Sequence, residues 1–403
     1  MLGILYANQG KLPEAEGMYE RSLEGKEKAL GRDHTSTLDT VNNLGILYQK
    51  QGKLPEAEGM YKRALEGKEK ALGRDHISTL DTVNNLGILY QKQGKLPEAE
   101  GMYKRALKGK EKALGRDYIS TLDTVNNLGI LYEKQGKLPE AEGMYKRALE
   151  GYEKALGRDH TSTLNTRALE GKEKALGRDH TSTLDTVNNL GILYQKQGKL
   201  PEAEGMYKRA LEGKEKALGR DHTSTLNTVY NLGILYQKQG KLPEAEGMYK
   251  RALEGKEKAL GRDHTSTLNT VNNLGSLYQK QGKLPEAEGM FKRALEGKEK
   301  ALGRDHTSTL DTVNNLGILY QKQGKLPEAE GMFKRALEGY EKALGLTHPK
   351  THTVTRNLQL LYSSRVNAPT GPGRSDPVSR TKVPGRLSTK LRSIIPFRKR
   401  SQQ

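Results

Sequence analysis

An all-α solenoid of repeated helix pairs is the fold that this sequence predicts. One block recurs at a fixed period, since Leu44, Leu86 and Leu128 stand 42 residues apart and the same spacing resumes from Leu190 to Leu316. A period of this length is typical of stacked helical units. Hydrophobic residues make up only 34% of the 403 residues, with three Phe and no Trp, which favours a narrow buried stripe in every unit over one large core.

The first helix of each unit is predicted from apolar residues that recur at helical spacing. In the unit that begins near position 36, these residues are Leu38, Val41, Leu44, Gly45 and Tyr48. Their spacing of three, three, one and three places them on one face of a helix. Ser36 and Asp39 form a capping-box pattern at the start of this helix, and Gly52 predicts a left-handed stop at its end.

A second helix follows, with Pro55 in its first turn and Gly73 at its end. Its apolar positions are Ala57, Met60, Tyr61, Ala64, Leu65, Ala71 and Leu72. Neither helix can bury its apolar face alone, so the two pack as a pair and each pair packs on the next. Gly59 and Gly67 recur inside this helix and each costs about 1 kcal/mol relative to Ala. We expect either a simple loss of stability or a close helix approach at one of the two.

The unit resembles the kinesin-light-chain-like type of tetratricopeptide repeat (TPR). Its matching positions are Leu44, Gly45, Tyr48, Ala57, Tyr61 and Ala64. Val41 stands where the pattern often has Trp, and Glu69 replaces the usual closing Pro. The resemblance covers residues 1 to about 362 and implies a superhelix of antiparallel helix pairs with a concave face lined by the first helices. Similar arrays also occur behind nucleotide-binding domains in fungal and bacterial sensor proteins.

The regular period is interrupted once, because Leu128 and Leu190 are 62 residues apart rather than 84. We expect one hybrid helix, about Thr163 to Leu176, that breaks the alternation of helix direction, so that the units after it either reverse direction or form a hinge with those before it. The predicted domains are a first array over 1–161, a hybrid half-repeat over 162–182, a second array over 183–362 and a disordered basic tail over 363–403. The first unit is truncated, since Met1 takes the place of Asn43 one period earlier, and we expect either the tail of a longer ancestral protein or a truncated gene model.

The sequence offers no pattern for catalysis, a cofactor or a metal. The absence of Cys excludes disulfides, thiolate metal sites and cysteine nucleophiles. Gly45, Gly52 and Lys53 are wrongly spaced for a phosphate-binding loop. Seven histidines occur one per unit in the same loop, so they cannot share a metal ion, and we expect them to pack the loop. They are His34, His76, His160, His180, His222, His264 and His306.

The concave face of the first helices is the predicted partner-binding groove. In relatives of this type an Asn on that face bonds the backbone of an extended peptide, and the resemblance assigns that role to Asn43, Asn85, Asn127, Asn189, Asn231, Asn273 and Asn315. The alternative is that these amides are tolerated polar residues of a solvated groove. A row of lysines would attract acidic partners: Lys50, Lys92, Lys134, Lys196, Lys238, Lys280 and Lys322. Tyr230 interrupts the uniformity and is a candidate aromatic anchor.

The formal charge of +19 is concentrated at the end of the chain. From Arg365 to Gln403 there are ten Lys or Arg against the single acid Asp376, which gives this tail a charge of +9. We expect disorder there, with a weak contact to an anionic partner, a nuclear-import signal or no specific role as the alternatives. No run of residues has the length and apolarity of a membrane span or a leader, so the expected location is the cytoplasm, with the nucleus as the alternative set by the tail.

These observations predict a non-enzymatic scaffold that binds peptide or helical segments of other proteins in its concave groove, with no small-molecule substrate. The alternatives are the sensor region of a nucleotide-binding signalling protein, a kinesin-light-chain-like cargo adaptor, and nucleic-acid binding through the tail.

Overall fold

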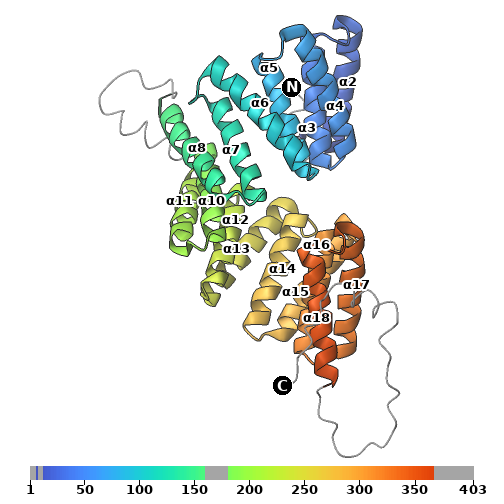
Figure 1. The fold of residues 1–403 in the computed structure, drawn as a ribbon. Helices are drawn as coiled ribbons and strands as arrows, with labels where there is room; N and C mark the ends of the chain where they lie inside the picture. Colours follow the sequence, from blue (N-terminus) through green and yellow to red (C-terminus); the bar gives the residue numbers. More distant parts are fainter. Residues whose placement is uncertain (1–5, 8–11, 159–179, 367–403) are drawn as a thin grey trace, which may run out of the picture.

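The computed structural model describes residues 6–7, 12–158 and 180–366. Sixteen α-helices, and no strand, are found in these ranges (Figure 1). The first helices of the units are α3 (Thr35–Gln51), α5 (Ile77–Lys92), α7 (Ile119–Lys134), α10 (Thr181–Lys196), α12 (Thr223–Lys238), α14 (Thr265–Lys280) and α16 (Thr307–Lys322). The second helices are α2 (Leu12–Leu30), α4 (Leu54–Leu72), α6 (Leu96–Leu114), α8 (Leu138–Arg158), α11 (Leu200–Leu218), α13 (Leu242–Leu260), α15 (Leu284–Leu302) and α17 (Leu326–Leu344). A last helix of the first type, α18 (Pro349–Val366), follows.

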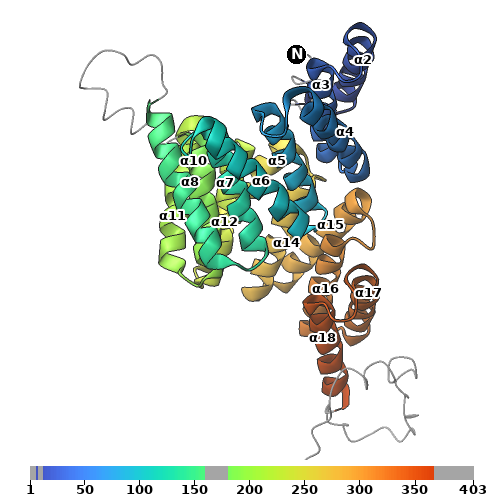
Figure 2. The same cartoon turned by 45° about the horizontal axis from the view of Figure 1, so that its top comes forward.

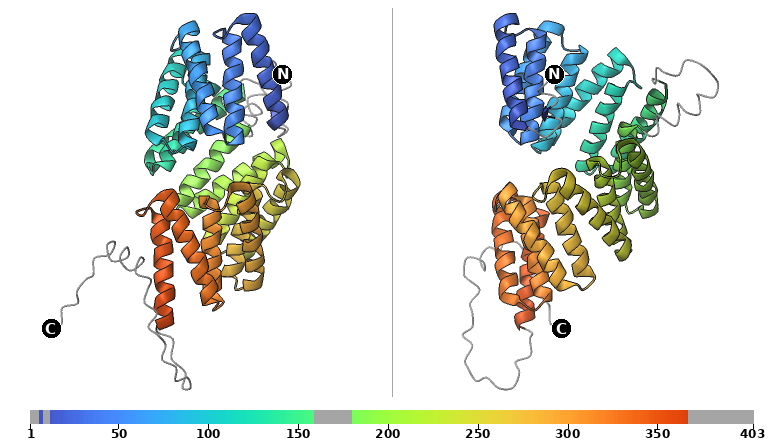
Figure 3. Two further views of the ribbon diagram at one scale, coloured as in Figure 1. Left: turned by 90° about the vertical axis from the view of Figure 1, so that its right-hand side faces the viewer. Right: turned by 180° about the vertical axis from the view of Figure 1, so that it is seen from behind.

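Stacking of these pairs produces a curved superhelix. Each first helix packs along its own second helix, and each second helix packs on the next first helix. The array bends so that the N-terminal and C-terminal units lie on the same side of its middle (Figures 1 and 2), and Figure 3 shows the two halves from the side and from behind. Consecutive first helices also contact one another, whereas consecutive second helices in the described ranges make no comparable contact. The first helices therefore line the inner face, and the predicted fold is confirmed.

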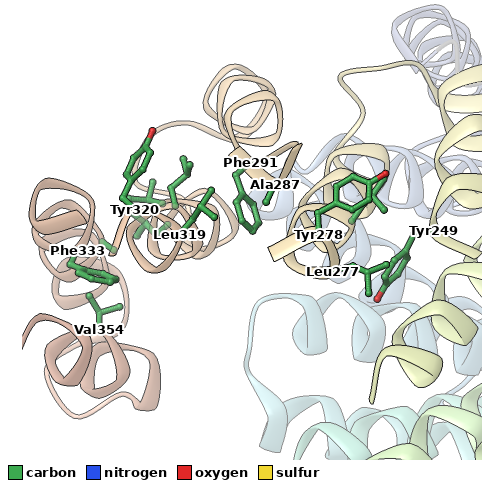
Figure 4. Packing of buried hydrophobic residues seen from close by; sticks show 14 of the residues in the cluster. Tyr249, Leu277, Tyr278, Ala287, Phe291, Leu319, Tyr320, Phe333 and Val354 are labelled. Atoms are coloured by element: carbon green, nitrogen blue, oxygen red, sulfur yellow. The ribbon is translucent and has the colours of Figure 1, made fainter. Parts of the chain in front are cut away.

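Buried side chains form a stripe that runs from unit to unit. Figure 4 shows Phe291, Leu319, Phe333 and Val354 arriving from four successive helices, α15 to α18, and all are at most 1% exposed. One continuous cluster of this kind extends from Ala203 to Leu361. The stripe is built from large side chains of one helix set against the small residues of its neighbour, in agreement with the composition.

Two glycines of each pair allow the helices to approach closely. A Cβ added at Gly45 would lie 2.8 Å from Cε1 of Tyr61, and one added at Gly67 would lie 2.6 Å from Cδ2 of Leu38. Gly59, by contrast, has open space around it. The expected close approach therefore occurs at Gly67, while Gly59 only lowers helix stability.

The helix ends agree with the predicted stops but not with the predicted capping box. Gly52 (φ 81°) is left-handed and ends α3, and Gly73 (φ 94°) ends α4 with a positive φ. Helix α3 begins at Thr35, so Ser36 already lies inside the first turn. The N-cap is His34, whose Nδ1 accepts from the N–H of Ser36 at 3.2 Å.

The histidines that recur once per unit cap the first helices from exposed positions. The prediction that they pack the loop was therefore wrong for His34, His76, His180, His222, His264 and His306. His160 lies outside the described residues.

The stacking continues across the interrupted period. Helix α8 packs directly on α10, as every other second helix packs on the following first helix. Arg209 pairs with Glu153 at 2.5 Å across this junction, and Arg105 pairs with Glu69 in the same way in a regular unit. The predicted break in packing is therefore corrected, because the side chains that join neighbouring units are all present on α8, α10 and α11. The predicted hybrid helix over 163–176 lies outside the described residues, as do residues 367–403 of the predicted tail. The start of that tail, residues 363–366, belongs to α18, so the prediction of disorder was wrong there.

Candidate functional site

The candidate site is the inner face, defined by the positions of Asp39, Asn42 and Asn43, Ile46, Gln49 and Lys50 in α3 and by the equivalent positions of the other first helices. Spacings of three and four residues place these positions along one side of each helix. Since consecutive first helices contact one another, the stripes of neighbouring units lie side by side. The face is mainly polar, with amides at its centre and charges towards both helix ends.

The predicted asparagines form a ladder with a second row of asparagines, which stand one position earlier in the preceding first helix. Nδ2 of Asn85 donates to Oδ1 of Asn42 in the preceding unit at 3.3 Å. The same bond, at 3.1 to 3.4 Å, joins Asn127 to Asn84, Asn189 to Asn126, Asn231 to Asn188, Asn315 to Asn272 and Asn357 to Asn314. Each amide has two donor hydrogens and an acceptor oxygen, so an asparagine pair joined by one hydrogen bond can still donate to and accept from a ligand. The paired asparagines recur in sequence in every full unit except that of Tyr230, and that signal would have predicted the ladder.

Tyr230 replaces one acceptor of this ladder. Its hydroxyl accepts from Nδ2 of Asn273 at 2.7 Å, and its ring lies 5.9 Å from that of Tyr249. Nζ of Lys256 stands 4.5 Å from the centre of the Tyr230 ring. Burial raises the pKa of Tyr230 to about 12. The residue predicted as an anchor is thus half-buried and built into the array.

The predicted lysines form an exposed positive row at the ends of the first helices. Lys196 pairs with Glu133 at 2.7 Å, whereas the other six lysines of the row form no ion pair within the described ranges. Partial burial, followed by the charges of Lys134 and Lys50, lowers the pKa of Lys92. The lysines of neighbouring units are therefore close enough to repel one another, and the row attracts anions.

A second set of lysines reaches the inner face from the second helices, and sequence reasoning missed it. Lys68, Lys110 and Lys214 are at most 3% exposed, and each pairs at 2.7 Å with a carboxylate of the first helix of its own unit. Their partners are Asp39, Asp81 and Asp185. In two other units a tyrosine replaces the lysine and donates to the aspartate, as Tyr152 to Asp123 and Tyr340 to Asp311. The available sequence signal was the residue after the close-packed glycine, which is Lys in most units and Tyr at positions 152 and 340.

Among the described units, two lack this carboxylate, because Asn227 and Asn269 occupy the aspartate position. Nζ of Lys256 contacts only the Thr270 hydroxyl at 3.4 Å and the Tyr230 ring. Nζ of Lys298 contacts Thr312 Oγ1 at 3.1 Å and the Ser308 carbonyl at 3.2 Å. Burial lowers the pKa of both lysines to about 8.

The described residues contain no cluster of three or more His, Asp or Glu that could hold a metal ion, and no described helix has the length and apolarity needed to cross a membrane.

The stacked helix pairs, with their first helices along an inner face, define a class of repeat solenoids. The family follows from the sequence profile of the tetratricopeptide repeat, which matches residues 1–70, 39–112, 77–154, 118–172, 163–216, 182–258, 224–300, 266–342 and 307–364. The chain belongs to the tetratricopeptide repeat family. No curated protein matches the sequence.

Several solved structures are similar in fold. The Rap conjugation gene regulator of plasmid pLS20, in complex with the Phr* peptide, is 18% identical with a TM-score of 0.54 and 77% of each chain covered. The apo form of RapI is 16% identical with a TM-score of 0.52, over 76% of this chain and 98% of RapI. A putative kinesin light chain from Podosopora anserina, with nearly identical TPR-like repeats, is 23% identical with a TM-score of 0.42, over 56% of this chain and 98% of its own length.

Proposed function

We propose that this chain is a non-enzymatic scaffold that binds an extended or helical segment of a partner protein along its inner face. The observation that carries the proposal is the repetition, on one continuous face, of amides with unused hydrogen-bonding capacity beside lysines without counter-charges. Amides serve the main chain of a segment of any sequence, and the lysines favour acidic segments.

A solved structure of the same fold supports this proposal, since the Rap regulator of plasmid pLS20 was determined with a bound peptide. The sensor and cargo-adaptor roles, the anionic contact of the tail and the cytoplasmic or nuclear location stay predictions. None of them has a specific observation among the described residues that favours it.

The experiment is selection of random 12-residue peptides on the purified protein, followed by affinity measurements on synthetic copies of the selected peptides. A variant that replaces three inner lysines, Lys92→Ala, Lys134→Ala and Lys238→Ala, should bind them about fivefold more weakly or worse.

A control variant with the same loss of charge replaces lysines on the outer surface, Lys70→Ala, Lys112→Ala and Lys258→Ala. It should bind within about twofold of the unchanged protein, because long-range attraction alone is weak in salt. Equal losses in the two variants, with unchanged melting temperatures, would argue against the inner face as the binding surface.

A further inference from the structure

Each regular unit contains a place for one carboxylate between consecutive first helices. Around Asp185, the ammonium of Lys214 donates at 2.7 Å and the hydroxyl of Ser224, from the next unit, donates at 3.2 Å. The same two donors surround Asp39 and Asp81. A buried lysine and a serine therefore form a carboxylate-binding pair that the protein normally fills with its own aspartate.

In the units of α12 and α14 the pair is present but the carboxylate is not. The Ser308 hydroxyl donates to Oδ1 of Asn269 at 3.4 Å, and neither Asn227 nor Asn269 contacts its lysine. A buried ammonium without a counter-charge is unfavourable, so an anion bound beside either lysine would stabilise its charged form. The lowered pKa of Lys256 and Lys298 has the same cause, the burial of the charge.

Neither lysine forms an ion pair with an acid of the described residues. Asp311 acts on Lys298 only through its charge, which raises the pKa of Lys298 against the larger effect of burial. Asp311 already pairs with Lys350 at 2.7 Å and accepts from Tyr340 at 2.5 Å. The exposed charges that α12 and α14 add to the inner face are Lys238 and Lys280, both positive. Two adjacent units therefore form a positive stretch in the interior of the array.

The empty carboxylate position lies at the surface although the lysines do not. The side chains of Asp39, Asp81 and Asp185 are 57%, 50% and 56% exposed where they cover lysines that are at most 3% exposed. Asn227 and Asn269 are exposed as well. A carboxylate that arrives from solvent can therefore take the aspartate position once the amide, which does not contact the lysine, turns aside.

We propose that Lys256 and Lys298 bind two carboxylates of an acidic partner segment and thereby fix its register on α12 and α14. The proposal rests on the proposed function, which places a segment on this face. Near-identical units offer a bound segment many equivalent positions, and these two units are distinct from the rest. Packed helices are about 10 Å apart and an extended segment rises about 3.3 Å per residue, so the two acidic residues stand about three positions apart.

The test compares two variants with equal added charge. Asn227→Asp with Asn269→Asp fills both positions as in the regular units, so folding should be preserved. Gly247→Glu with Gly289→Glu adds the same charge on the second helices α13 and α15, outside the inner face, at exposed glycines with open space around them. The probes are acidic peptides selected from the random library and their Asn- and Gln-substituted copies.

We expect the unchanged protein to select peptides with two acidic residues two to four positions apart. The Asp variant should bind them at least about tenfold more weakly, and the Glu variant less than about threefold more weakly. The neutral copies should bind all three proteins equally. A thermal unfolding scan of each variant shows whether the fold is kept.

Equal weakening in both variants, or no preference for acidic peptides, would overturn the proposal while leaving the scaffold function in place. Displacement of the acidic peptide by a single-stranded oligonucleotide at equal concentration would assign the site to phosphates instead. Absence of any peptide binding to the inner face would contradict the scaffold function itself, and the register proposal with it.

Discussion

Units built on α3, α5 and α10 and units built on α12 and α14 have the same helix pairs but different charge balance on the inner face. In the former, a buried lysine such as Lys214 is neutralised by its own aspartate. In the latter, Asn227 or Asn269 leaves Lys256 or Lys298 without a carboxylate. One carboxylate-to-amide change therefore alters the chemistry of a repeat surface while the buried stripe beneath it stays the same.

The largest expected effect tests whether the two kinds of unit share the same packing. Gly67→Ala and Gly255→Ala should each destabilise the protein by about 1–3 kcal/mol, because the new Cβ would lie 2.6 Å from Leu38 and 2.5 Å from Leu226. Urea unfolding of the two variants measures the cost.

The control is Gly247→Ala, which has open space around it and should instead stabilise by up to about 1 kcal/mol. A cost at Gly255 well below that at Gly67 would mean that the units of α12 and α14 are packed more loosely, and the difference between the units would then extend beyond charge.

A smaller effect is expected from exchanging the charge pattern between the units. Asp185→Asn leaves Lys214 without its partner and should destabilise by about 1–2 kcal/mol, whereas Asn227→Asp should stabilise by a similar amount. Differential urea unfolding of the two variants and of the double variant checks both signs. Destabilisation by Asn227→Asp would instead show that the Tyr230 ring already compensates Lys256 better than a carboxylate would.

The pH dependence of stability follows from the lysines with lowered pKa. Between about pH 8 and the ordinary lysine value of 10.5, the unfolded chain holds protons that folded Lys256 and Lys298 have released. Stability should therefore rise with pH in this window, at most by about 1.4 kcal/mol per pH unit for each lysine. Urea titrations at pH 7.5, 8.5 and 9.5 measure the rise, and Asn227→Asp with Asn269→Asp should remove it.

Sequence reasoning predicted the features that depend on neighbours along the chain. The helix pairs follow from the period and the apolar spacing, and the stops follow from Gly52 and Gly73, whose positive φ only glycine adopts at low cost. The polar stripe of Asn43 and Lys50 follows from helical geometry alone. These are local signals, and they recur in every unit.

The features that it missed depend on contacts between helices. The sequence analysis assigned no role to Lys68, whose side chain crosses between helices to Asp39 and is buried there. Likewise, the junction after α8 was expected to break the array, because the missing residues were counted without the contacts, such as Arg209 with Glu153, that hold α8 against its neighbours. Only the packing of the helices reveals either feature.

The smallest effect concerns the one regular unit whose first helix lacks a histidine cap. Tyr118 precedes α7 and makes no side-chain cap, whereas Nδ1 of His76 accepts from the N–H of Ser78 at 3.2 Å before α5. Tyr118→His should therefore stabilise the protein by about 0.5–1 kcal/mol at pH 7.5. At pH 5 the gain should vanish, because a protonated imidazole has no acceptor nitrogen. Urea unfolding at both pH values measures the gain, with His76→Tyr as the reverse exchange, and a gain that persists at pH 5 would assign it to loop packing instead of the cap.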